Sequence, residues 1–157
     1  MKLIALLLLY LIPTINTPAL NTKVIEYVNA VIGQQVDRGE CWDLAAAALD
    51  YAGAYLDRSN QKNLYIFGRK VNPHKDQIFA GDIIQIENVK LEYTKGNAIY
   101  YETMSHHTAI IYEVIGKYEY KLAHQNTSFS GRKVGLSDLN LNNIKKGQIA
   151  FYRPYKK

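Results

Sequence analysis

The sequence predicts an α+β fold, with N-terminal helices packed on an antiparallel β-sheet. Apolar residues recur at helical spacing early in the chain, whereas later segments are β-branched or alternate and are separated by short Gly-containing turns. Because the helices precede the strands and do not alternate with them, the order indicates α+β and not α/β. The 157 residues contain no repeat or linker and have room for one domain.

Residues 1–19 have the pattern of a signal peptide. One charge, Lys2, is followed by ten uncharged and mostly apolar residues (3–12), which are too few to span a bilayer. Ala19 offers a small residue for cleavage. We therefore expect a protein exported to the periplasm or outside the cell, with a single folded domain over 20–157; an uncleaved N-terminal anchor is the alternative.

Two helices are expected before the sheet. The first runs from a cap at Asn21 or Thr22 to a stop at Gly33, with valines on one face. The second runs from Cys41 to about Tyr55, because four consecutive alanines favour helix. The second helix is apolar nearly all round, which indicates that it is buried.

The remainder of the chain predicts antiparallel strands. A turn at Gly81-Asp82 opens the first of them, and Gly116-Lys117 joins a hairpin. The expected strands are residues 83–87 continuing to about 93, 98–103, 108–115, 118–123 and 148–152. Residues 56–79 fit neither the helical nor the strand periodicity, so their structure is ambiguous from the sequence.

Cys41 is the one cysteine of the chain, so no intrachain disulfide can form. At a helix N-terminus, backbone N–H groups and the helix dipole stabilise a thiolate, which is the nucleophilic form of cysteine. Cys41 is therefore a candidate for covalent catalysis. The alternative is a buried structural cysteine.

Polar residues that could assist Cys41 flank the predicted hairpin. His107 stands directly before a strand and could take the thiol proton. His124 and Asn126 follow the partner strand, at the same end of the sheet, where either could orient His107. Gln35 precedes the cysteine by six residues and could donate to an oxyanion, although a solvated loop role is the alternative.

Four motifs in order resemble papain-like thiol hydrolases, most of all the CHAP amidases and their NlpC-type relatives. The resemblance implies a papain-like core with Cys41 as nucleophile and His107 as base. His124 matches the NlpC-type third residue, and Asn126 matches the Asn of the CHAP Glu-x-Asn pair. Glu40 stands where those families have Asp, and residues 56–79 form a long insert. The motifs are Gly39–Ala45, Ala80–Ile84, His107–Ile111 and His124–Asn126.

The resemblance implies a secreted cysteine hydrolase that cleaves amide or isopeptide bonds, with peptidoglycan peptides as the expected substrate for an amidase or endopeptidase. It also implies a monomer that needs no cofactor, and makes an inhibitor or immunity protein a candidate partner. The alternative is a non-catalytic module that binds glycan or peptide through some of the 13 tyrosines.

The charge distribution and the histidine spacing argue against a nucleic-acid-binding protein and against a metal site. The net charge of +5 is spread over the chain and does not form the basic cluster typical of a nucleic-acid groove. The four histidines lack the HExxH or Cys-pair spacing of metal sites, so no metal is expected.

Overall fold

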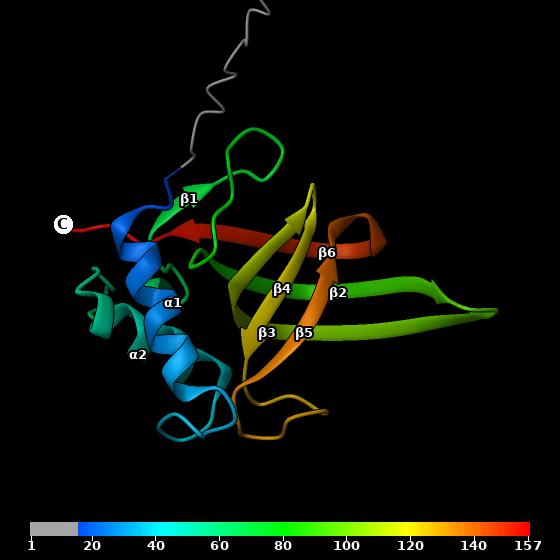
Figure 1. Cartoon of the computed structure of the whole chain (residues 1–157), viewed down its shortest axis with the longest axis horizontal. Helices are drawn as coiled ribbons and strands as arrows, with labels where there is room; N and C mark the ends of the chain where they lie inside the picture. The colour runs from blue at the N-terminus through cyan, green and yellow to red at the C-terminus, as the bar shows by residue number, and fades with distance from the viewer. Residues whose placement is uncertain (1–15) are drawn as a thin grey trace, which may run out of the picture.

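The computed structural model describes residues 16–157. Within that range, two helices lie beside a six-stranded antiparallel sheet, which confirms the α+β prediction (Figure 1). The predicted signal peptide lies outside the described residues except for 16–19. None of the described helices combines the length and apolar character needed to cross a membrane. The elements are α1 (Ala19–Val31), α2 (Cys41–Ala52), β1 (Arg69–Val71), β2 (Ile83–Lys95), β3 (Ala98–Gly116), β4 (Glu119–His124), β5 (Gly135–Asn140) and β6 (Ile144–Arg153), with short 3₁₀ helices at Gln61–Asn63 and Leu141–Asn143.

The two predicted helices are present with shifted ends. α1 begins after Pro18, so the prediction that Asn21 or Thr22 caps it is wrong. Asn21 is instead buried within the helix and donates to Asp82, a long-range role that local patterns do not reveal. α2 begins at Cys41 as predicted, and ends at Ala52 because Gly53 takes the left-handed conformation (φ 69°).

The sheet has the order β1-β6-β2-β3-β4-β5. The predicted strands at 98–103 and 108–115 are one continuous strand, β3, because the long partner β2 stays hydrogen-bonded to it through Met104 and His107. The end of the β2–β3 hairpin that carries the turn projects beyond the core (Figure 1). Its residues therefore do not alternate between apolar and polar as those of a half-buried strand do. β5 pairs with β4 at the edge of the sheet and was missed, as was the short β1 within 56–79.

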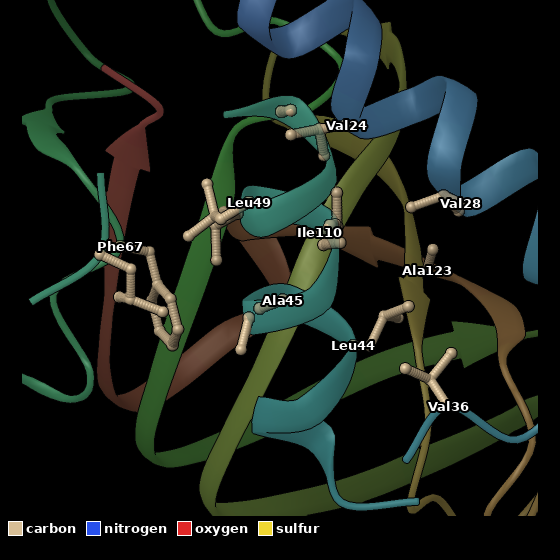
Figure 2. Close-up of a cluster of buried hydrophobic side chains, with 14 of the residues drawn as sticks. Val24, Val28, Val36, Leu44, Ala45, Leu49, Phe67, Ile110 and Ala123 are labelled. Atoms are coloured by element: carbon tan, nitrogen blue, oxygen red, sulfur yellow. The ribbon is translucent and has the colours of Figure 1, made fainter. Parts of the chain in front are cut away.

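Apolar side chains fill both faces of the sheet. The cluster between the helices and the sheet appears in Figure 2, where the alanine-rich α2 lies against the strands. Small side chains on α2 allow this close approach. The helix-side cluster includes Val24, Val28, Leu44, Ala45, Leu49, Phe67, Ile110 and Ala123; the cluster on the opposite face includes Ile84, Ile86, Ala109, Ile111, Leu122 and Phe151.

The Gly81-Asp82 turn joins α1 to the sheet. Fully buried Asp82 accepts hydrogen bonds from Asn21 Nδ2 (2.8 Å) and from Arg153 Nη2 (2.8 Å) and Nε (3.1 Å). Gly81 has φ +87°, and a Cβ there would lie 2.4 Å from the backbone oxygen of Asn21. The turn therefore needs glycine for both its conformation and its clearance from α1.

Substituting Gly81 with Ala should destabilise the fold more than the same change at Gly96. Both glycines have positive φ, but the space around Gly96 is open. We expect Gly96→Ala to lower the free energy of unfolding by about 1–2 kcal/mol, and Gly81→Ala by a further ~1–3 kcal/mol through overpacking. Urea denaturation of both variants measures this difference, and equal losses would contradict the proposed clash.

Candidate active site

The N-terminus of α2 meets the sheet where β3 and β4 separate. The last β3–β4 pair is Ile110 with Ala123. The residues that follow Ala123 are therefore not bonded to β3 and can bond to other segments. The fully buried Gln125 side chain fills this position. Its Oε1 accepts from Val36 N (3.1 Å), and its Nε2 donates to Val36 O (2.9 Å) and Glu40 O (2.8 Å). These bonds hold the residues just before Cys41 against Gln125, the residue that directly follows β4.

Cys41 is half-buried at the first position of α2. The backbone N–H of Glu40 donates to Asp43 Oδ2 (3.1 Å), and Arg38 Nη2 lies 2.6 Å from Asp43 Oδ1, which fixes the first turn. The Cys41 N–H has no acceptor within the helix and is available to a ligand. In the described part of the chain, no hydrogen bond engages the thiol.

His107 and His124 form a hydrogen-bonded pair inside the protein. His107 Nε2 lies 2.8 Å from His124 Nδ1, and the rings meet edge to face with centroids 5.0 Å apart. His107 Nδ1 has no hydrogen-bond partner among residues 16–157, so it is the nitrogen left to accept a proton. The β3–β4 hairpin thus brings His107 and His124 into contact, as the sequence predicts.

Both histidines are neutral near pH 7. Burial, with a smaller contribution from the nearby His106, lowers the pKa of His107 to about 4. Burial likewise lowers the pKa of His124 to about 3, with a smaller contribution from His107. Each ring therefore carries one N–H, and the tautomer decides which ring donates the hydrogen bond between them.

His107 lies within β3 and not at the start of a strand, so that part of the prediction is wrong. The preceding residue, His106, is hydrogen-bonded into the same strand but points the other way, as alternation requires. Its Nδ1 lies 2.8 Å from Glu87 Oε1, and its ring meets Tyr65 edge to face at 4.4 Å. The two adjacent histidines thus occupy different environments.

The other two predicted site residues bond elsewhere. Gln35 is exposed and donates to Asp37 O (3.1 Å) within its own loop. Asn126, at φ 61°, donates to Glu40 Oε2 (2.7 Å) and makes no hydrogen bond to His107. Of the two candidates for the orienting residue, the structure therefore brings His124 to the base.

Two residues of this region carry no role in the sequence-based prediction. Gln125 stands within the His124–Asn126 motif, and its burial was the missing information. Ser137 Oγ lies 2.8 Å from His124 Nε2, and nothing in the sequence signalled it because β5 was not predicted.

A groove of about 1,090 Å³ reaches the two histidines and Ser137, with Phe129 on its wall. Within residues 16–157, no group of three or more His, Cys, Asp or Glu side chains is placed to hold a metal ion. The groove thus gives a ligand access to the histidine pair, and Cys41 is not among the residues that line it.

Two solved structures share this fold. The crystal structure of Ly7917 matches with a TM-score of 0.50 and 18% identity over 84% of this chain. The crystal structure of Ly7917 with the hydrolyzing product of MDP matches with a TM-score of 0.52 and 19% identity over 85%. In each case the alignment spans 62% of the Ly7917 chain.

No curated protein matches the sequence. A family model does match, over residues 19–157, and it is described as the AIM3/BBC1 cysteine proteinase-fold domain. That range covers every described helix and strand, including the cysteine at the start of α2 and both buried histidines. The chain belongs to the AIM3/BBC1 cysteine proteinase-fold domain family, and its papain-like architecture follows from that membership.

Proposed function

We propose that this protein is a cysteine hydrolase that cleaves amide bonds with Cys41 as nucleophile and His107 as general base. The observation that carries the proposal is the buried His107–His124 pair at 2.8 Å, which leaves His107 Nδ1 without a hydrogen-bond partner among the described residues. Cys41 at the first position of α2 supplies the nucleophile. The cysteine proteinase fold of the family supports it.

The proposed roles of Cys41 and His107 define the reaction. Cys41 Sγ attacks the carbonyl carbon while its proton passes to His107 Nδ1, and the carbonyl oxygen becomes an oxyanion. The Cys41 N–H stabilises that oxyanion, with Gln35 as a further donor if its side chain turns from Asp37. Collapse breaks the C–N bond, His107 gives its proton to the leaving amine, and a thioester remains. Water, deprotonated by His107, hydrolyses the thioester and releases the thiol.

His124 has the orienting role. By accepting from His107 Nε2–H, its Nδ1 holds the His107 ring in the tautomer that keeps Nδ1 unprotonated.

Peptidoglycan peptides are the proposed substrate, cut by amidase or endopeptidase action. The motif resemblance to CHAP and NlpC-type enzymes favours this substrate, and the structural likeness to Ly7917, one structure of which holds the hydrolyzing product of MDP, supports it. Export through the predicted signal peptide 1–19 would bring the enzyme to the cell wall, and an inhibitor or immunity protein would limit its action.

Removing the thiol should abolish cleavage. We expect Cys41→Ala to lose at least about 10³-fold in rate, and His107→Gln about 10²–10⁴-fold, since each removes a group that acts in the transition state. The measurement incubates purified peptidoglycan with each variant and reads the fragment masses. His74→Gln, an exposed histidine bonded to Tyr118, is the matched control and should keep full activity.

Each alternative outcome of that experiment has a definite meaning. Equal fragments from wild type and Cys41→Ala would exclude Cys41 as nucleophile. Without fragments from the wild type, the cell-wall substrate is wrong, and a panel of peptide and isopeptide amides then tests the hydrolase itself; inactivity on the panel favours the non-catalytic binding module.

The pH profile should show a low acid limb. Because burial lowers the pKa of His107 to about 4, the base stays unprotonated well below the ordinary histidine value of about 6.5. Activity is therefore expected to persist at pH 5 and to fall as pH decreases through about 4. Initial rates from pH 3.5 to 8 measure the limb, and a midpoint near pH 6.5 would contradict the assignment.

A further inference from the structure

We propose that Ser137 is a positioning residue that sets the tautomer of His124 and, through it, that of His107. The catalytic consequence rests on the proposed function, whereas the tautomer assignment concerns the site alone. The basis is an unbroken series of two hydrogen bonds, His107–His124 and His124–Ser137, each 2.8 Å long.

The sheet places Ser137 beside His124 by register. Leu122 of β4 pairs with Ser137 of β5, and His124 pairs with Gly135. Ser137 is therefore the diagonal neighbour of His124 on one face of the sheet, within reach of its ring. The hydroxyl arrives from a strand that carries no other part of the site.

Counting protons leaves two arrangements. Each neutral ring has one N–H, so both bonds are satisfied only if both rings carry it on the same nitrogen. In the first arrangement, His107 Nε2–H donates to His124 Nδ1, and His124 Nε2–H donates to Ser137 Oγ. In the second, Ser137 donates to His124 Nε2, His124 Nδ1–H donates to His107 Nε2, and His107 carries its proton on Nδ1.

Only the first arrangement supplies a base. With its proton on Nδ1, His107 cannot accept the thiol proton of Cys41, whereas with its proton on Nε2 it can. The intrinsic preference of a neutral histidine for the Nε2–H form favours the first arrangement for both rings. Ser137 lines the groove, so its own hydrogen can turn toward solvent or substrate while its oxygen accepts.

Loss of the hydroxyl would remove this preference. His124 is 4% exposed, and the Phe129 ring lies over it with centroids 5.4 Å apart. Without Ser137 Oγ, the first arrangement newly leaves the buried His124 Nε2–H unpaired. The second newly leaves only a lone pair of His124 unpaired, in addition to the His107 Nδ1–H that lacks a partner whether or not Ser137 is present. Buried N–H groups without partners are the less tolerated of the two, so the balance moves toward Nδ1–H.

Long-range ¹H–¹⁵N spectra of the histidine rings at pH 7 read the tautomers directly. For the full chain we expect Nε2–H at both His107 and His124. Ser137→Ala should bring Nδ1–H signals in both rings, and Ser137→Thr, which keeps a hydroxyl, should restore the wild-type pattern. Ser128→Ala is the matched control, since Ser128 lines the same groove and, among the described residues, bonds to neither ring.

The inference is overturned if wild-type His107 carries its proton on Nδ1, or if Ser137→Ala leaves the tautomers of both rings unchanged. The first of these results needs no variant, so it decides the matter even if Ser137→Ala fails to fold.

Kinetics on a cleaved amide separate this inference from the proposed function. We expect Ser137→Ala to lower kcat about tenfold with KM nearly unchanged, and Ser137→Thr to recover it. A Ser137-dependent tautomer without Cys41-dependent cleavage would retain the inference and refute the function. If cleavage depends on Cys41 but the tautomers do not change in Ser137→Ala, the proposed function is retained and the inference is refuted.

Discussion

The site depends on one buried side-chain amide. Gln125 both accepts from Val36 N and donates to Val36 O and Glu40 O, a combination that a carboxylate could not make. Glu40 and Gln125 are 85 residues apart in sequence. Since Cys41 follows Glu40 and Gln125 follows His124, the amide ties the start of α2 to the end of β4. The backbone directly before Cys41 is thereby held against the residue that follows His124.

Neutral groups form the interior of the site, and charges lie around it. Burial keeps His107 and His124 uncharged, and Gln125 is an amide. Glu40 instead lies toward solvent, where it accepts from Asn126 Nδ2 (2.7 Å) and lies 3.2 Å from Arg132 Nη1. This separation avoids the cost of a buried unpaired charge, and it leaves the outer ion pair to hold the two loops together.

Sequence patterns predicted what depends on local order. A run of alanines after Cys41 gave α2 and the place of the thiol, and the hairpin gave the meeting of His107 with His124. Features that depend on long-range contacts were not predictable. The local sequence around Asn21 is typical of a helix cap, and its hydrogen bond to Asp82 is evident only in the folded structure. Ser137 lies in an edge strand whose polar residues carry no periodicity, and the exposed hairpin made β3 look like two strands.

Because β3 is continuous, its register with β2 decides which of the two adjacent histidines, His106 or His107, faces the groove. Because successive side chains alternate, a slip of β3 by one residue would exchange His106 for His107 at His124. Two contacts on the opposite face resist that slip: His106 with Glu87, and Thr108 Oγ1 donating to Gln85 Oε1 (2.6 Å). Evolution can therefore lengthen the projecting hairpin in matched pairs of residues, whereas a single insertion on one arm would have to be absorbed by a bulge before the sequence reaches His106.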